Sequence, residues 1–428
     1  LTVVVQKVGE ETFLAQVVSM VRAAQGSRSR SQDLANRAAL WLTVIAISAG
    51  SVTLAAWLIL GKEFVFAMER MVTVMVITCP HALGLAVPLV VAVSTSLAAS
   101  SGLLLRDRAA FERSRMIDTV VFDKTGTLTE GLFGVQEILP AGDVPVEEVL
   151  RLAGAVEALS EHPIARGIVE AAREKGLEIP EAEEFEAVKG KGARATVKGR
   201  RIMVASPGYL EEKNIKAGLE GLDEQFGQGR TVIFVLEGER VLGAISLGDT
   251  VRPESREAVS RLRGMGIRSL MLTGDNEGVA KAVSETLGLS EYFAEVLPDQ
   301  KAGKIRELMG RGWKVAMTGD GVNDAPALAT ADLGIAIGAG TDVAVETADV
   351  VLVRSDPRDV ASIFELARAT YRKMLQNLAW ATGYNLFAIP LAAGVLAGWG
   401  IVLSPAVGAL LMSLSTVIVA VNARLLKV

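Results

Sequence analysis

Long stretches of this sequence are apolar and contain no charged side chain. Asp, Glu, Lys and Arg are all missing from three segments: residues 38–61, 71–105 and 374–423. About 20 helical residues cross the roughly 30 Å hydrocarbon core of a bilayer. We therefore expect four transmembrane helices, at about 40–60, 68–95, 377–397 and 402–423.

Basic residues flank these segments unequally. Arg and Lys cluster before the first span, after the second, before the third and after the fourth, whereas the two short connections carry few charges. Positive side chains favour the cytoplasmic side of a membrane. We therefore expect both ends of the chain and its central region to be cytoplasmic.

The central region, residues 106–373, has a different pattern, in which short apolar runs alternate with amphipathic helical stretches such as 253–264 and 276–287. The apolar runs are Thr119–Asp123, Arg268–Thr273, Lys314–Thr318, Gly334–Ile337 and Val350–Val353. Such alternation predicts a parallel sheet with helices on both faces.

More than a hundred residues separate the first of these strands from the second, which is too many for a crossover connection. Residues 132–246 have turn signals of their own and end in two strand-like runs, Thr231–Leu236 and Val241–Leu247. We therefore expect this insert to be a separate domain.

Composition narrows the class of protein. The chain has 44 Lys and Arg against 49 Asp and Glu, and 50% of its 428 residues are hydrophobic. Such hydrophobicity excludes a disordered chain, and the lack of a basic excess argues against nucleic acid as a partner. The single cysteine excludes an intramolecular disulfide framework and a zinc site with several cysteines.

Polar residues with phosphate chemistry follow successive predicted strands. Asp123 ends the first strand and opens Asp-Lys-Thr-Gly-Thr-Leu-Thr, Thr273 precedes Gly274 and Asp275, and Lys301 begins a later helical stretch. Asp320 and Asp324 lie in Gly-Asp-Gly-Val-Asn-Asp, and carboxylates of this kind are ligands for Mg²⁺. Alone, each residue reads as a turn, a cap or a surface charge. Their order, at the ligand-binding edge of an open α/β sheet, indicates phosphoryl chemistry on Asp123.

With these motifs the sequence resembles the P-type ATPases, whose cytoplasmic part is a haloacid dehalogenase-like phosphorylation domain with an inserted nucleotide domain. The resemblance implies that Asp123 takes the γ-phosphoryl group of ATP as an aspartyl-phosphate. It further implies roles for the residues around Asp123. Lys124, Thr273, Gly274 and Asp275 would line the site, Lys301 would contact phosphate, Asp123, the Thr125 carbonyl and Asp320 would hold Mg²⁺, and Asn323 and Asp324 would complete the loop.

The insert carries a second set of matches. Glu157 and the string Ser160-Glu161-His162-Pro163 resemble the heavy-metal subclass of these pumps, in which such a histidine packs against adenine. Gly190 and Gly192 resemble the glycine pair beside the nucleotide. Without the resemblance, His162 would read as a surface or core-edge histidine, and the glycines as a weak turn signal.

Cys79-Pro80-His81 lies near the middle of the second predicted span. Proline removes a backbone hydrogen bond and frees carbonyls, and ionisable residues inside a membrane are functional by default. A thiolate with an imidazole favours soft or borderline metals such as copper, silver or zinc. The alternative is that Cys79 packs as a small apolar residue and that His81 bonds to a neighbouring helix.

The last two predicted spans contain further polar residues: Asn377, Tyr384, Asn385 and Pro390 in the third, and Met412, Ser413, Ser415, Thr416 and Asn422 in the fourth. Each by itself reads as packing or as helix–helix hydrogen bonding. As a set they resemble copper-exporting heavy-metal pumps of the Cys-Pro-His branch. This resemblance implies that Tyr384, Asn385, Met412 and Ser415 lie near the transported metal. Because an imidazole replaces one thiolate, Cu⁺, Cu²⁺ and Ag⁺ all stay open.

The resemblance divides the chain into six parts. They are an actuator remnant (1–37), a helix pair with Cys-Pro-His (38–105), the phosphorylation domain (106–131 and 247–373), the nucleotide domain (132–246) and a last helix pair (374–428). Family members carry two further spans and an actuator domain with a Thr-Gly-Glu loop before the first span seen here. We therefore expect this chain alone to bind nucleotide but to turn over poorly.

The main hypothesis is an ATP-driven copper exporter in a bacterial or archaeal cytoplasmic membrane. Its expected cofactors are ATP and Mg²⁺, and its expected partners are a copper or silver ion, membrane lipid and a cytosolic copper chaperone. A zinc or cadmium pump is an alternative, although such pumps usually have Cys-Pro-Cys and a charged residue in the last span. A membrane-anchored phosphatase of the dehalogenase type and a metal-sensing membrane protein without catalysis are two others.

Overall fold

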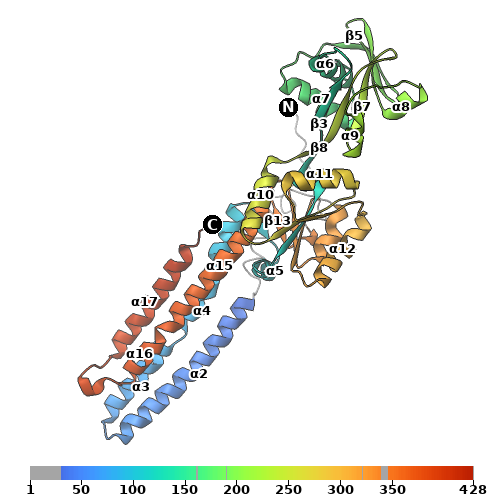
Figure 1. Ribbon diagram of the computed structural model, residues 1–428. Coiled ribbons are helices and arrows are strands. Elements are labelled where there is room, and N and C mark those ends of the chain that lie inside the picture. Colours follow the sequence, from blue (N-terminus) through green and yellow to red (C-terminus); the bar gives the residue numbers. More distant parts are fainter. Residues whose placement is uncertain (1–29, 161, 189, 321, 339–345, 428) are drawn as a thin grey trace.

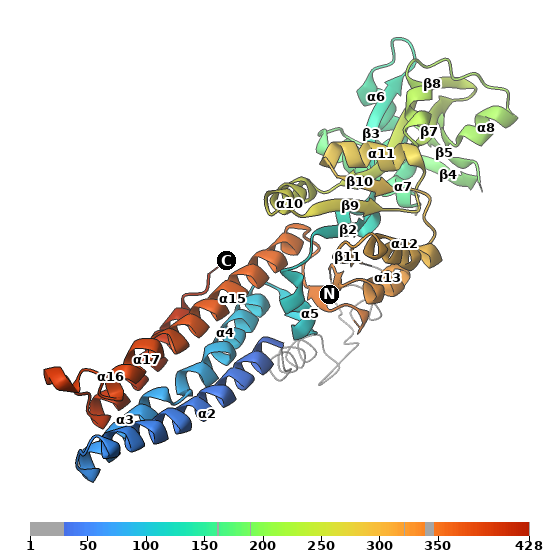
Figure 2. The ribbon, with the colours of Figure 1, turned by 60° about the horizontal axis from the view of Figure 1, so that its bottom comes forward.

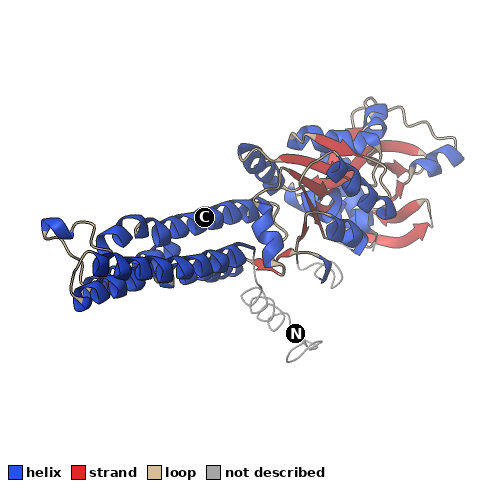
Figure 3. Ribbon diagram, turned by 90° about the horizontal axis from the view of Figure 1, so that it is seen from below, coloured by secondary structure: helices blue, strands red, loops and turns tan. Residues whose placement is uncertain are grey.

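The computed structural model describes residues 30–160, 162–188, 190–320, 322–338 and 346–427. It has three parts in a row: a helical bundle, a seven-stranded sheet covered by helices, and a six-stranded sheet at the far end (Figure 1). Figure 3 shows the same division, because the long helices gather at one end and the strands at the other. Most of the predicted actuator remnant, residues 1–29, lies outside the described residues.

The bundle confirms three of the four predicted spans. Its helices are α2 (Arg30–Ile59), α3 (Phe64–Thr78), α4 (His81–Ser100), α15 (Arg358–Gly383), α16 (Asn385–Ala392) and α17 (Pro405–Arg424), with a short 3₁₀ turn η4 (Ala397–Trp399). Within the described part of the chain, three helical segments are long and apolar enough to cross a membrane: Ala35–Ile59, Phe64–Ser100 and Pro405–Arg424. Many of their large apolar side chains point outward, as is usual for helices that face lipid.

The third predicted span, 377–397, is not one helix. Helix α15 begins far outside the apolar segment, ends at Gly383, and is followed by the short α16, which contains Pro390. Glycine is a poor helix former, and proline removes a helical hydrogen bond, so the sequence itself weakens a continuous span here. The apolar pattern of 377–397 therefore covers two helical pieces rather than one.

The seven-stranded sheet forms the core of the phosphorylation part. Its strands are β1 (Leu103–Leu105), β2 (Thr119–Asp123), β9 (Arg268–Leu272), β10 (Glu291–Phe293), β11 (Val315–Gly319), β12 (Leu333–Ala336) and β13 (Val350–Leu352). They lie in the order β1-β13-β12-β11-β2-β9-β10, and all neighbours are parallel except β1 and β13. The five predicted strands are confirmed to within a residue at each end. β1 and β10, both three residues long, are additions.

Helices cover both faces of this sheet (Figure 2). α10 (Pro253–Gly264) and α11 (Glu277–Leu287) lie on one face, and α12 (Pro298–Gly310) and α13 (Ala325–Thr330) on the other. Along β2, Val120 and Phe122 face the first cluster of buried side chains and Val121 faces the second. This alternation is what a strand buried on both faces requires.

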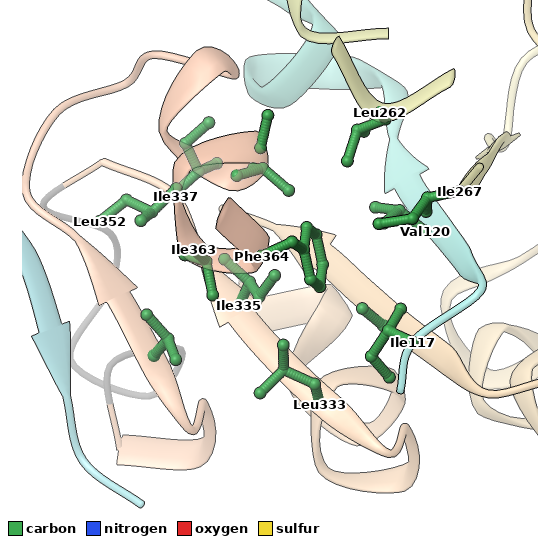
Figure 4. Packing of buried hydrophobic residues seen from close by; sticks show 14 of the residues in the cluster. Ile117, Val120, Leu262, Ile267, Leu333, Ile335, Ile337, Leu352, Ile363 and Phe364 are labelled. Atoms are coloured by element: carbon green, nitrogen blue, oxygen red, sulfur yellow. The ribbon is translucent and has the colours of Figure 1, made fainter. Parts of the chain in front are cut away.

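Helix α15 also packs on the first face. Phe364 lies in the middle of that cluster, next to side chains from the sheet and from α10 (Figure 4). The helix therefore has one end in the core of the phosphorylation part and the other in the bundle. Helix α5 (Arg108–Ser114) follows β1 at the same junction.

The insert is antiparallel and has its own core. Its strands are β3 (Thr129–Pro140), β4 (Ala182–Val188), β5 (Gly192–Val197), β6 (Arg200–Ala205), β7 (Thr231–Glu237) and β8 (Arg240–Val251), and its helices are α6 (Val146–Glu157), α7 (Pro163–Glu174), α8 (Pro207–Glu212) and α9 (Leu222–Gly227). Strands β3 and β8 pair along their length and connect the insert to the phosphorylation part. The two predicted strands correspond to β7 and β8, but β8 continues to Val251.

Candidate functional site

The polar residues of the phosphorylation motif meet at one edge of the seven-stranded sheet. β2 lies between β9 and β11, so its last residue, Asp123, is flanked by the carboxyl ends of both neighbours. Thr273 follows β9, and Asp320 follows β11. The topology therefore brings together residues that lie up to about two hundred positions apart in the sequence.

Lys301, at the start of α12, is the cation of this site. Its Nζ lies 2.5 Å from Oδ1 of Asp123 and 2.7 Å from Oδ1 of Asp324. All three side chains are buried. A buried lysine between two carboxylates offsets negative charge at the point where a phosphoryl group would arrive.

Burial controls the charge of the carboxyl groups. It raises the pKa of Asp123 to about 7, and the negative charge of Asp324 adds to the rise, whereas Lys301 opposes it. Burial and Asp324 raise the pKa of Asp320 as well. Burial disfavours the charge on Lys301, but the two carboxylates outweigh it and raise the pKa of this lysine. A second cation at the site would stabilise the ionised form of Asp123.

The carboxylates fit such a cation. Oxygens of Asp123, Asp320 and Asp324 lie within 4.8 Å of one another. Gly126, at a φ of +74°, lies so close to Asp320 that a Cβ at this position would overlap the carboxylate. Hard oxygen donors in this number suit Mg²⁺. The predicted ligand pair Asp123 and Asp320 is thus brought together.

Lys124 points to the other side of Asp123. Its ammonium forms an ion pair with Asp275 and lies 3.4 Å from Asp249. The hydroxyl of Thr129 donates to Asp249, and Arg252 donates to the carbonyls of Thr129 and Gly126. Asp249 and Arg252 thus hold the phosphorylation loop.

Sequence reasoning missed both residues. The available signal was their position, since they lie where the insert returns to the sheet.

Two adjoining cavities lead from the insert to this loop. One, of about 470 Å³, is lined by Glu157, His162, Gly131 and Phe133 among others. The second, of about 540 Å³, shares Gly131 and Phe133 with it and reaches Lys124 and Asp275. A nucleotide with its base near His162 could therefore extend its phosphates toward Asp123.

The predicted residues of the insert form two pairs, of which Glu157 and His162 line the same cavity. Glu157 is buried at the end of α6, and burial raises the pKa of its carboxyl. His162 caps α7, where its Nδ1 accepts the Ile164 amide. Gly190 and Gly192 lie at the turn between β4 and β5 and are not among the described residues that line either cavity. Asn323 is exposed beside the carboxylates.

The predicted metal pair lies at a break in the bundle. α3 ends at Thr78 and α4 begins at His81, so Cys79, with φ −55° and ψ 125°, lies outside both helices. The Tyr384 hydroxyl donates to the carbonyl of Ile77 at 3.2 Å.

Tyr384 also lies beside Cys79 and Ser415. The buried side-chain oxygen of Asn385 has no hydrogen-bond partner in the described part of the chain. Three predicted residues, Cys79, Tyr384 and Ser415, thus bring oxygen and sulfur to the opened backbone. Met412 is half-buried on α17, and its role near the metal stays a prediction.

Known proteins with similar sequences agree with this geometry. The family model for haloacid dehalogenase-like hydrolases matches residues 117–332. The chain is 64% identical to "Copper-exporting P-type ATPase B" of Archaeoglobus fulgidus, over 100% of this chain and 61% of that protein. It is 48% identical to the protein of the same name from Enterococcus hirae, over 98% of this chain and 56% of that protein. The chain therefore spans about three fifths of the length of these relatives.

A solved structure supports the assignment at the level of the fold. One crystal structure of a zinc-transporting PIB-type ATPase matches with a TM-score of 0.75 and 34% identity. This match covers 97% of the present chain and 67% of the other. The chain therefore belongs to the haloacid dehalogenase-like family and, within it, to the PIB-type class of P-type ATPases.

Proposed function

We propose that this chain is the catalytic and metal-carrying part of a pump that exports copper, as Cu⁺ or Cu²⁺, or silver, as Ag⁺, at the expense of ATP. One observation carries the proposal. The same chain contains a buried aspartate paired with a lysine and, at a break between two membrane helices, a cysteine and a histidine, and helix α15 connects the two regions. A phosphatase would need the first feature only.

In the chemical step, an Asp123 oxygen attacks the γ-phosphorus of ATP. The bond to the oxygen bridging the β- and γ-phosphorus breaks, and ADP leaves with that electron pair. Lys301 neutralises charge on the incoming phosphoryl group, and Lys124 lies where the cavity from the insert ends. Mg²⁺, bound by Asp123, Asp320 and the Thr125 carbonyl, would screen phosphate oxygens. Water later hydrolyses the aspartyl-phosphate.

The cargo is proposed from donor chemistry and from the relatives. Cys79 and His81 supply a thiolate and an imidazole, which suit copper and silver, and the relatives with 64% and 48% identity are named copper exporters. Zinc is the competing cargo because the matching solved structure is that of a zinc-transporting ATPase. Residues 402–423 contain no charged side chain, which favours the copper assignment. A cytosolic copper chaperone is a proposed donor of the metal.

Labelled ATP tests the proposal in membranes that contain the full-length pump. We expect an acid-stable, hydroxylamine-sensitive phosphoenzyme, formed in the presence of copper or silver and abolished in Asp123→Asn. Cys79→Ala and His81→Ala should lose the metal stimulation but keep phosphorylation from inorganic phosphate. Stimulation by zinc alone would replace copper with zinc as the cargo. A phosphoenzyme that ignores every metal would overturn the pump assignment.

A further inference from the structure

Three hydrogen bonds form a continuous chain across α15, α17 and α4. Lys373 Nζ donates to Oδ1 of Asn422 at 3.0 Å. Nδ2 of Asn422 then donates to Oδ1 of Asn377 at 2.8 Å, and Nδ2 of Asn377 donates to the carbonyl of Ala86 at 3.0 Å. Asn377 is completely buried. All three hydrogen bonds run in one direction, from the charged Lys373 donor to a backbone acceptor inside the bundle.

The direction of these bonds decides what Asn377 can do. An amide binds a metal through its oxygen, because the nitrogen lone pair is delocalised, and the Asn377 oxygen already accepts from Asn422. By contrast, the buried oxygen of Asn385 has no partner in the described residues. The Asn385 oxygen can therefore bind a cargo ion without losing a hydrogen bond, whereas Asn377 cannot turn toward one without breaking its bonds to Asn422 and Ala86.

The acceptor, Ala86, lies close to the metal pair. It follows His81 by five residues on α4, or about 7.5 Å along the helix axis. Pro88, two residues further into the same helix, has no N–H, so the Gly84 carbonyl loses its helical partner. Helix α4 thus lacks the backbone hydrogen bond that would span Ala86. A bond from a neighbouring helix at this point fixes how α4 is turned.

Helix α15 connects this bond to the phosphorylation part. The helix is continuous from Arg358 to Gly383, and its first half packs in the core with Phe364. Glu365 also pairs with Arg261 of α10 at 2.7 Å. A shift of α10 and the sheet would therefore move α15 as a unit, and Asn377 would transmit that shift to Ala86.

We propose that Asn377, held in orientation by Asn422 and Lys373, is a positioning residue through which α15 sets the rotation of α4. It thereby places Cys79 and His81 for cargo binding, and it is not itself a ligand of the ion. This inference rests on the proposed function, since it assumes that a metal ion binds at Cys79 and His81.

The test uses the full-length pump in lipid vesicles and four variants: Asn377→Leu, Asn422→Leu, Lys373→Met and, as a matched control, Gln376→Leu. Gln376 is the neighbouring amide on α15, and its side chain is exposed. Cu⁺ bound per pump and the X-ray absorption spectrum of the bound ion report the ligands. Phosphoenzyme formed from ATP at increasing Cu⁺ concentration reports the coupling.

We expect the first three variants to bind as many ions as wild type, with the same absorption spectrum. They should need about three to ten times more Cu⁺ for half-maximal phosphorylation, the factor that an interhelical hydrogen bond in a membrane corresponds to. Combining Asn377→Leu with Lys373→Met should raise the required Cu⁺ concentration little further, because both substitutions interrupt the same series of hydrogen bonds. Gln376→Leu should behave as wild type.

Two results would overturn the inference. Loss of a bound ion or of a ligand signal in Asn377→Leu alone would make Asn377 a ligand. If all three variants need the same Cu⁺ concentration as the Gln376→Leu control, the three hydrogen bonds have no role in coupling. Phosphorylation by inorganic phosphate without Cu⁺ verifies folding, and Asn422→Leu carries the test if Asn377→Leu misfolds. A wild-type pump that shows no metal-stimulated phosphorylation would instead contradict the proposed function.

Discussion

At the scale of single residues, the active site depends on the buried cation of Lys301. In Lys301→Met, Asp123 and Asp324 lose their cation, and breaking a buried pair in this way costs about 3–5 kcal/mol. We therefore expect the strands β2 and β11 to exchange their amide hydrogens faster in Mg²⁺-free buffer, with a local unfolding free energy lower by about that amount. Arg306→Met, an exposed cation on the same helix, should change it by less than about 0.5 kcal/mol.

The effect of Lys301→Met should also depend on pH. Burial already raises the pKa of Asp123 to about 7, and removing Lys301 raises it further because the lysine opposes the rise. A carboxyl group whose pKa is higher in the folded than in the unfolded state lowers the free energy of unfolding as the pH rises through its folded-state pKa. Lys301→Met should therefore lower the free energy of unfolding by less at pH 6 than at pH 8. Equal losses at both values would show that the lysine acts through packing rather than through charge.

At the scale of elements, the proposed cargo site depends on the break between α3 and α4. Pro80→Ala restores an N–H and lets α3 and α4 approach one continuous helix, which would turn Cys79 and close the carbonyls around it. We expect Cu⁺-stimulated phosphorylation to fall by about tenfold or more. Pro405→Ala is the matched control, because Pro405 lies in the first turn of α17, where a missing N–H costs no helical hydrogen bond. Equal activity of the two variants would show that the break does not matter for the cargo.

At the scale of the whole molecule, the backbone enters and leaves the insert through the paired strands β3 and β8. Its two clusters of buried side chains contain residues of the insert only. We therefore expect residues 129–251 to fold by themselves and to unfold in one cooperative transition. ATP at 100 times its Kd should stabilise this piece by about 2.7 kcal/mol, measured as a rise in the melting temperature. His162→Ala should lose most of that rise, whereas the exposed Lys175→Ala should keep it. A broad transition without ATP stabilisation would contradict the assignment of the insert.

The sequence alone predicted the elements whose pattern is local. The strand Thr119–Asp123 and the helix at 253–264 agree with β2 and α10 at both ends, because buried apolar runs and amphipathic periods are set by neighbouring residues. β4, β5 and β6 of the insert went unpredicted. β4 is an edge strand, largely polar and half exposed, so it lacks the apolar run on which strand prediction depends.

The residues of the candidate active site also fall into those that the sequence predicted and those that it did not. Asp123, Lys301 and Asp320 were predicted from motif and order, and the structure brings them together at one edge of the sheet. Asp249 and Arg252 were missed, since only the pairing of β3 with β8 returns them to the phosphorylation loop. A residue that acts by holding another loop has no local signature.

By itself, then, the sequence predicted three of the four spans, five strands of the seven-stranded sheet and the carboxylates that gather at its edge. These properties follow from hydrophobicity, periodicity and side-chain chemistry, which each residue carries wherever it lies. Only the tertiary structure decided that the span at 377–397 is broken and that the Asn377 oxygen is occupied by Asn422. Both depend on which helices come to lie side by side, and a hydrogen bond between distant residues exists only after the chain has brought them within about 3 Å.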